Sequence, residues 1–135
     1  MVKMTAVYRG RFHCEATHEP SGSRIETDAP KDNEGLGERF SPTDLVGAAL
    51  ATCVLTTMGI MAKRNGIVME GARAQVEKEM VSVPTRRIGA LRVTVHMPAA
   101  LSPEERRKLE SAGHHCPVHQ SLHTDVVVDL TFVYE

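Results

Sequence analysis

The stretch from Ser41 to Gly66 constrains the fold more than any other, because it predicts one long apolar helix with a defined start and end. Ser41 suits an N-cap, and Pro42 suits the first helical position, where its missing N–H costs nothing. Asp44, three residues after Ser41, completes a variant of the capping box and places negative charge at the positive end of the helix dipole. Asn65-Gly66 is a typical C-terminal stop. We therefore expect one continuous helix between these caps.

Apolar side chains lie on every face of this predicted helix, so we expect it to be buried on all sides. A domain of 135 residues seldom surrounds a helix completely, so part of the cover should come from a second subunit. The apolar run from Leu45 to Ala62 is nearly long enough to span a bilayer. It contains three threonines and two glycines, however, and the amphipathic segments around it favour a buried core helix and no membrane association.

Composition and charge limit the class of protein. One chain of 135 residues predicts a single domain over residues 1–135. The net charge of -1 and the lack of a basic stripe argue against nucleic acid as a partner. The first residues contain no apolar run, so no signal peptide is expected. Three cysteines, an odd number, fit reduced thiols in the cytoplasm better than a disulfide framework.

Segments on both sides of the helix alternate apolar and polar residues, or are rich in β-branched residues, as strands do. Strands are expected over residues 2–8, 11–17, 23–27, 72–83, 87–97 and 125–134. Arg9-Gly10 should form the first hairpin turn, and the glycine-rich residues 29–38 should form a loop. Ser102, followed by a proline and two glutamates, starts a shorter helix that ends near Gly113. This order predicts an α+β fold with mostly antiparallel strands around the central helix.

Two cysteines carry the candidate chemistry. Cys53 lies in the middle of the long apolar helix, too far from its N-terminus for the helix dipole to activate the thiol. This position is more typical of an inert core residue, and a reactive Cys53 needs a cation such as arginine beside it. Cys116 precedes Pro117 and suits the N-cap of a short helix, where the dipole and free N–H groups favour a thiolate. From the residues alone, Cys116 is the better candidate nucleophile, and a solvated polar loop is the alternative.

Several histidines close to Cys116 in sequence raise the question of a metal site. They are His114, His115, His119 and His123, of which the last two would share a helical face. The cluster contains no CxxC pair and no carboxylate, so we predict no metal and no cofactor. A metal-binding redox sensor built on Cys116 stays a further hypothesis. Cys14, in a predicted strand, is more typical of core or edge packing.

The segment SPTDLV at residues 41–46, followed by AALATC up to Cys53, resembles the cysteine-bearing helix of the OsmC/Ohr superfamily. CPVHQSL at residues 116–122 resembles the second cysteine motif of that superfamily. The separation of the two cysteines, the closing strand and the strand order agree as well, so the resemblance covers nearly the whole chain. It implies an OsmC-like α+β fold and an intertwined homodimer, with two central helices packed together and active sites at the subunit interface.

The resemblance also implies a cysteine-based peroxidase that acts on small organic hydroperoxides in the oxidative stress response. In the family the first cysteine, here Cys53, is the peroxidatic thiolate, and it becomes a sulfenic acid. The second, here Cys116, resolves the sulfenic acid as a disulfide, which an external dithiol reductant then opens. This assignment reverses the order that the residues alone favour.

One position departs from the family pattern. In the peroxidases a glutamate directly follows the helix-opening proline and helps to hold an arginine against the peroxidatic sulfur. Here Thr43 stands at that position, and Asp44 follows about 100° further around the helix. We expect Glu38 to replace the missing glutamate and Arg39, or else Arg24, to be the arginine. The predicted catalytic residues are therefore Cys53, Cys116, Arg39, Arg24 and Glu38.

The alternative is a non-catalytic OsmC-like module. The same cleft between subunits, lined by Met58, Met61 and aliphatic side chains, would then hold an apolar or lipid-like ligand without turnover.

Overall fold

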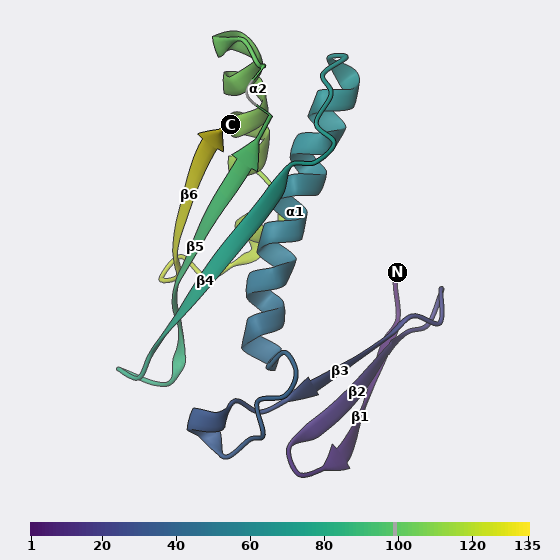
Figure 1. Ribbon diagram of the computed structural model, residues 1–135. Coiled ribbons are helices and arrows are strands. Elements are labelled where there is room, and N and C mark those ends of the chain that lie inside the picture. Colours follow the sequence, from purple (N-terminus) through teal and green to yellow (C-terminus); the bar gives the residue numbers. More distant parts are fainter. Residues whose placement is uncertain (99) are drawn as a thin grey trace. The chain divides into compact units, whose positions relative to one another are not determined.

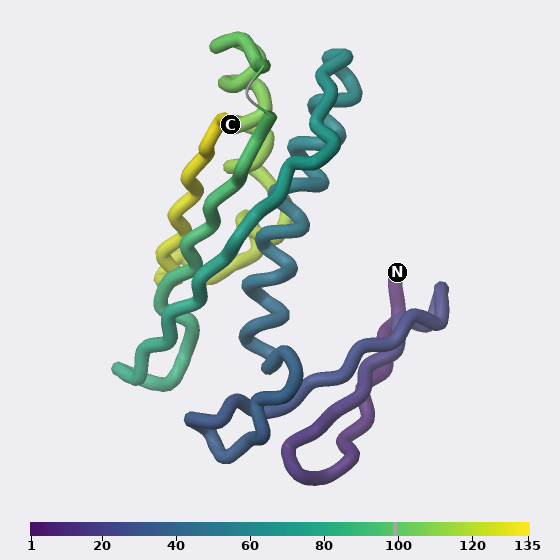
Figure 2. Tube along the Cα trace, in the orientation of Figure 1, coloured from purple at the N-terminus to yellow at the C-terminus, as the bar shows by residue number. Residues whose placement is uncertain are grey.

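The computed structural model describes residues 1–98 and 100–135, and the chain divides into two compact units (Figures 1 and 2). The first unit is Met1–Val46, and the second is Gly47–Glu135. The described residues form two three-stranded sheets and several helices, so the predicted α+β class is confirmed. The single domain predicted for residues 1–135 stays a prediction.

The first unit is an antiparallel sheet followed by a loop. Its strands, in the spatial order β1-β2-β3, are β1 (Met4–Gly10), β2 (His13–His18) and β3 (Arg24–Asp28). The glycine-rich loop after β3 contains a short 3-10 helix, η1 (Lys31–Asn33). The strands begin and end close to their predicted bounds, because the alternation of side chains is a local property of the sequence.

The first hairpin turn lies two residues beyond its predicted place. Gly10 still belongs to β1, and the turn consists of Arg11 and Phe12. Both residues have a positive φ, 54° and 61°, which is uncommon outside glycine and asparagine. The N–H of Phe12 donates a hydrogen bond to the Tyr8 hydroxyl (3.3 Å), which supports this turn. The predicted turn at Arg9-Gly10 was wrong because it relied on glycine to supply the positive φ.

The second unit contains the long helix and a mixed sheet. Helix α1 (Pro42–Arg64) begins in the first unit and continues into the second. It is followed by β4 (Arg73–Val81), β5 (Arg87–Met97), α2 (Pro103–His114), α3 (Pro117–Ser121) and β6 (Val127–Tyr134). Strands β4 and β5 pair antiparallel, whereas β5 and β6, which α2 and α3 connect, are parallel. Pairing in the described residues is thus mostly antiparallel, as predicted.

The start of α1 has the hydrogen bonds that its sequence predicts. The N–H of Asp44 donates to the Ser41 hydroxyl (3.0 Å), and the N–H of Ser41 donates back to the Asp44 carboxylate (2.9 Å). Ser41 is only 1% exposed, so this capping box is buried. Helix α2 starts with the same reciprocal hydrogen bonds, between Ser102 and Glu105 (3.2 and 2.8 Å). Both predicted helix starts are therefore confirmed.

One face of α1 packs on the sheet of the second unit and on α2 (Figure 1). Leu50, Val54 and Met58 lie on this face and are fully buried. A Cβ atom added at Gly47 would lie 3.6 Å from side chains of β4 and β5. A Cβ atom added at Gly113 of α2 would lie 3.2 Å from the Met58 sulfur. The core of the second unit is therefore the space between α1, α2 and the sheet.

The opposite face of α1 is open in the single chain. Ile60 is 50% exposed, and Thr52 and Thr56 are exposed as well. One chain thus leaves part of α1 uncovered, as expected for a domain of this size, and cover by a second subunit stays a prediction. By length and mean hydropathy (1.9), α1 also qualifies as a membrane span. Core helices share these properties, and the packing of α1 on β4, β5 and α2 is that of a core helix.

Candidate active site

Two cysteines from different helices of the second unit come together. Cys53 lies in the middle of α1, and its side chain is partly buried. Cys116 is the residue before α3 and is fully buried, with 0% exposure. The Cys53 side chain lies near enough to Cys116 to raise its pKa, and neither cysteine is in a disulfide. A buried thiol therefore lies directly beside a more accessible one.

Burial and the contact with Cys53 keep the proton on Cys116. Desolvation raises the pKa of Cys116, and the hydrogen bond and charge of Cys53 raise it further. The N–H of His119 donates to the Cys116 sulfur (3.4 Å), as expected at an N-cap, and this bond lowers the pKa. Desolvation has the larger effect, so the pKa of Cys116 is raised overall. The N-cap position of Cys116 was predicted correctly, but the thiolate expected there was wrong, because local sequence contains no information about burial.

This pair of thiols has the arrangement needed for a dithiol–disulfide cycle. A reagent from solvent reaches Cys53 first, because Cys116 has no exposed surface. The contact between the two side chains means that an oxidised sulfur on Cys53 would have a thiol within reach. Cys14, the third cysteine, lies on β2 in the first unit, and its role stays a prediction.

The four histidines near Cys116 have separate partners. His119 donates its backbone N–H to the Cys116 sulfur, while its Nδ1 atom is buried and has no hydrogen-bond partner among the described residues. The His115 side chain lies 2.7 Å from a backbone carbonyl oxygen, and the His123 side chain accepts a hydrogen bond from a backbone N–H (3.0 Å). The His114 ring packs against an aromatic ring. Among the described residues, no cluster of donor atoms suited to a metal includes any of these side chains. The metal-sensor hypothesis gains no set of ligands from the described part of the chain and stays a hypothesis.

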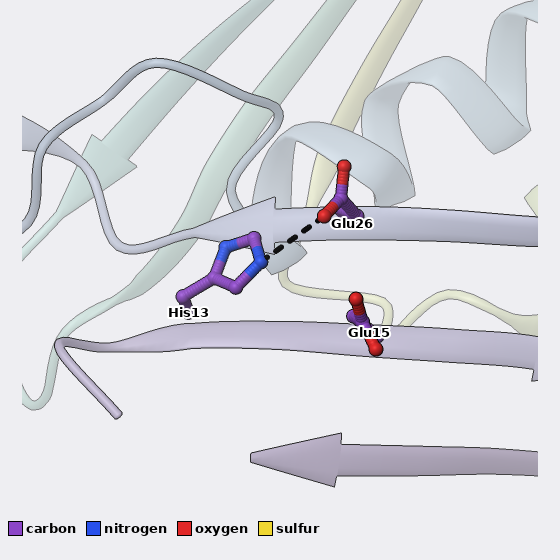
Figure 3. A group of neighbouring side chains, drawn as sticks. All are labelled: His13, Glu15 and Glu26. Atoms are coloured by element: carbon purple, nitrogen blue, oxygen red, sulfur yellow. Dashed lines mark ion pairs between the residues drawn. The ribbon is translucent and has the colours of Figure 1, made fainter. Parts of the chain in front are cut away.

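In the first unit, Arg39 belongs to a ring of alternating charges. The Arg39 Nε–H donates to Glu26 Oε2 (3.3 Å), and its Nη1–H donates to Asp28 Oδ2 (3.5 Å). The other oxygen of each carboxylate faces His13. The His13 Nδ1 lies 2.8 Å from Asp28 Oδ1. The His13 Nε2 lies 3.3 Å from Glu26 Oε1, the ion pair drawn in Figure 3. We refer to His13, Glu26, Asp28 and Arg39 as the Arg39 ring.

The register of β2 and β3 builds three sides of this ring. His13 lies opposite Asp28, and Glu15 lies opposite Glu26. Because side chains alternate along a strand, residues 13 and 15 share a face of the sheet with residues 26 and 28. His13, Glu26 and Asp28 were not among the predicted site residues. The available signal was the spacing of charged residues. Residues 13–15 have the pattern H-x-E in one predicted strand, and residues 26–28 have the pattern E-x-D at the end of the next predicted strand.

The pKa values of His13, Asp28 and Arg39 are all shifted in the direction that favours the charged forms of these side chains. The hydrogen bond with His13, followed by the charge of Arg39, lowers the pKa of Asp28. Asp28 in turn raises the pKa of His13, and Arg39 opposes that rise. The charges of Glu26 and then Asp28 raise the pKa of Arg39. The Asp28 side chain is 3% exposed, against 22% for His13 and 41% for Arg39, so the ring is anchored on one buried carboxylate.

The remaining predicted residues, Arg24 and Glu38, lie outside the ring. Arg24 pairs with Glu15 (3.0 Å), which holds a second arginine as well. Glu38 is exposed beside Arg39 and contributes to a pocket of about 450 Å³. The carboxylates that bind Arg39 are nevertheless those of the ring. The catalytic role of Glu38 stays a prediction, and the acids that hold Arg39 come from β3 instead.

Three side chains of the first unit approach one another as metal ligands do. One nitrogen of His13 and one oxygen each of Glu15 and Glu26 lie within 4.8 Å of one another (Figure 3). Guanidinium groups already neutralise both carboxylates, because Glu15 pairs with two arginines and Glu26 pairs with Arg39. The charges are balanced without a cation, and we assign no metal to this group.

Comparisons with known proteins agree with this architecture. The OsmC-like protein family profile matches residues 35–131. One similar crystal structure is that of an osmotic stress induced and detoxification response protein from Psychrobacter arcticus 273-4. It has a TM-score of 0.92 and 35% sequence identity, and the match covers 98% of this chain and 96% of that chain. The organic hydroperoxide resistance protein OsmC of Legionella pneumophila has a TM-score of 0.76 and 21% identity, with coverage of 98% and 96%.

Among curated proteins, the uncharacterized protein YmaD of Bacillus subtilis (strain 168) is 29% identical over 72 residues. That match spans 53% of this chain and 47% of YmaD, so the chain matches about half the length of this curated relative. The family profile covers well over half of the chain and includes both Cys53 and Cys116. The predicted OsmC-like fold is thus confirmed, and the chain belongs to the OsmC-like protein family of the OsmC/Ohr superfamily.

Proposed function

We propose that this protein reduces organic hydroperoxides, with Cys53 as the nucleophilic thiolate and Cys116 as the resolving cysteine. The observation that carries the proposal is the contact between these two thiols, which come from different helices of the second unit. Membership of the OsmC/Ohr superfamily, in which structural relatives are described as organic hydroperoxide resistance proteins, supports the class of reaction.

The proposed cycle has three steps. The Cys53 sulfur attacks one peroxide oxygen, an S–O bond forms as the O–O bond breaks, and the alcohol leaves with a proton. Cys53 is oxidised by two electrons to a sulfenic acid, and the peroxide is reduced by two. The Cys116 thiol then attacks the Cys53 sulfur, water leaves, and a disulfide forms. An external dithiol opens this disulfide by two exchanges, so no bound cofactor takes part.

The asymmetry of the two thiols supports their assigned roles. Cys53 is the more accessible, and Cys116 is fully buried and holds its proton. A buried protonated thiol is a poor nucleophile toward a peroxide in solvent. Its contact with Cys53 suits attack on a sulfenic acid formed there. We therefore prefer the order inferred from the family resemblance to the order inferred from the residues alone.

We propose Arg39, ahead of Arg24, as the cation that keeps Cys53 ionised. The two ring carboxylates bind Arg39, as the family glutamate binds its arginine, and they are better candidates for this task than Glu38. The Arg24 side chain is 60% exposed and, within the described part of the chain, pairs only with Glu15. The carboxylate of Asp44, which follows the family glutamate position, is engaged in the cap of α1.

Turnover of cumene hydroperoxide with dithiothreitol tests the thiol chemistry. We expect no turnover for Cys53→Ser. Without reductant, Cys116→Ser should still reduce one peroxide per active site and leave a sulfenic acid that dimedone traps. Cys14→Ser is the matched control and should turn over like the wild type. Unchanged turnover in Cys53→Ser would overturn the proposal.

We also propose that the protein is a cytoplasmic homodimer. The open face of α1, with Ile60 50% exposed, supports cover by a second copy. Size-exclusion chromatography with light scattering measures the mass in solution. A monomer at micromolar concentration would contradict the dimer.

A second candidate function is binding of an apolar ligand without turnover. One pocket of about 670 Å³ supports it, a volume typical of small-molecule sites. It is lined by α1 from Leu55 to Lys63 and by residues 66–72. Met58, which was expected to line the ligand cleft, is fully buried against α2, so that part of the prediction was wrong.

Fluorescence of an apolar probe in this pocket tests the second candidate. A Cβ atom added at Gly59 meets nothing within 4 Å, so Gly59→Phe should fill the pocket without disturbing the core. Wild-type protein should bind the probe, and Gly59→Phe should not. Equal probe fluorescence for the two proteins would reject the pocket as a ligand site.

A further inference from the structure

The Arg39 ring contains a titratable cation that the thiol chemistry does not use. Glu26 and Asp28 each present one oxygen to Arg39 and the other to His13. Two cations therefore share two carboxylates. We propose that His13 is a positioning residue for Arg39: it competes for these carboxylates, so that protonation of His13 loosens Arg39 and neutral His13 leaves Arg39 firmly bound.

The distances in the ring indicate which contact yields. The His13 Nδ1 lies 2.8 Å from Asp28, whereas the two contacts of Arg39 are 3.3 and 3.5 Å long. Arg39 is also the more exposed cation, with 41% of its side chain accessible against 22% for His13. Repulsion between two positive side chains on one carboxylate pair therefore displaces Arg39 before His13.

The buried carboxylate of Asp28 makes the two cations interdependent. Its side chain is 3% exposed, so water cannot freely replace a lost partner. Its hydrogen bond raises the pKa of His13, and the charge of Arg39 lowers that pKa. Arg39 thus disfavours protonation of His13. Because linkage is reciprocal, protonation of His13 in turn weakens the binding of Arg39 to the carboxylates.

Other charged groups around His13 leave the direction of this effect unchanged. From β3 it faces Glu26 and Asp28, and from the loop after β3 it faces Arg39. On its own strand, Glu15 is the nearest acid, and the arginine of β1 that approaches this face is paired with it. The charge of Glu15 is thus compensated, and the competition stays within the ring.

The catalytic consequence rests on the proposed function, in which Arg39 serves Cys53. Alkylation of Cys53 slows as pH falls, because less of the thiol is ionised. As pH falls through the pKa of His13, loosening of Arg39 should slow this alkylation further. We expect an additional loss of about two- to fivefold, the range typical of coupling between partly exposed charges. His13→Gln, which is always neutral and of similar size, should lack this additional loss.

An NMR titration of His13 in the full chain tests the competition without using activity. Arg39→Gln should raise the pKa of His13, because the competing cation is gone. Arg24→Gln is the matched control, since it removes the same charge at an arginine outside the ring, and it should shift the pKa less. An identical pKa of His13 in the wild type and in Arg39→Gln would overturn the proposal.

The pH dependence of Cys53 alkylation, read by mass spectrometry, tests the positioning role. The additional loss should appear in the wild type and be absent in His13→Gln. Identical profiles for these two proteins would overturn the positioning role. Absence of peroxide turnover, together with an Arg39-dependent pKa of His13, would reject the proposed function and support the competition within the ring.

Discussion

Replacement of Ser41 by alanine measures what a buried capping box contributes to α1, the helix that carries Cys53. The change removes the acceptor of a 3.0 Å hydrogen bond from the Asp44 N–H. Loss of a serine N-cap costs about 0.5–2 kcal/mol of stability. Ser41 is 1% exposed, so water cannot take over the bond, and we expect a loss of about 2 kcal/mol. For a chain of this size, that loss lowers Tm by roughly 6–10 °C.

Ser102→Ala is the matched control for this prediction. It removes the same bond, 3.2 Å long, from the capping box at the start of α2, but Ser102 is exposed. Water can replace the hydroxyl there, so we expect a loss of about 0.5–1 kcal/mol. Urea unfolding followed by circular dichroism, at one protein concentration, gives both free energies. Equal losses for the two variants would refute the reasoning that burial sets the contribution of the cap.

Further predictions concern the core, the thiols and the ring. Leu50→Ala should lower the unfolding free energy by about 2–5 kcal/mol in urea unfolding, because Leu50 is fully buried. Iodoacetamide should alkylate Cys53 long before Cys116 in the folded protein, and equal labelling by mass spectrometry would mean that Cys116 is not shielded. The lowered pKa of Asp28 gives stability that is complete above its unfolded pKa and is lost as pH falls through the folded value, so Asp28→Asn should flatten the acid limb of stability against pH. The raised pKa of His13 gives stability that is complete below its unfolded pKa and is lost as pH rises through the folded value, so His13→Gln should remove that decline near neutral pH.

Most elements of the fold could be predicted because their signals are local. The capping boxes at Ser41 and Ser102 act through bonds between residues three positions apart, and strand alternation is visible in any short window. The first hairpin turn was misplaced because Arg11 and Phe12 adopt a positive φ that their residue types do not indicate. Burial on all sides of α1 stays a prediction, because the single chain leaves one face open and an apolar pattern does not say which chain provides the cover.

Taken alone, the amino-acid chain predicted the two candidate cysteines, Cys53 and Cys116, and the N-cap position of the second. Folding decided the state of that second thiol. Desolvation and the contact with α1 raise the pKa of Cys116, and they outweigh the hydrogen bond at its cap.

The same division holds for the arginine. Arg39 was predicted, with Arg24 as the alternative, from its place before the helix, whereas the carboxylates that bind Arg39 became apparent only from the register of β2 and β3. Caps and alternation depend on neighbours in sequence, but desolvation and ion pairing depend on residues that only packing and strand pairing bring together.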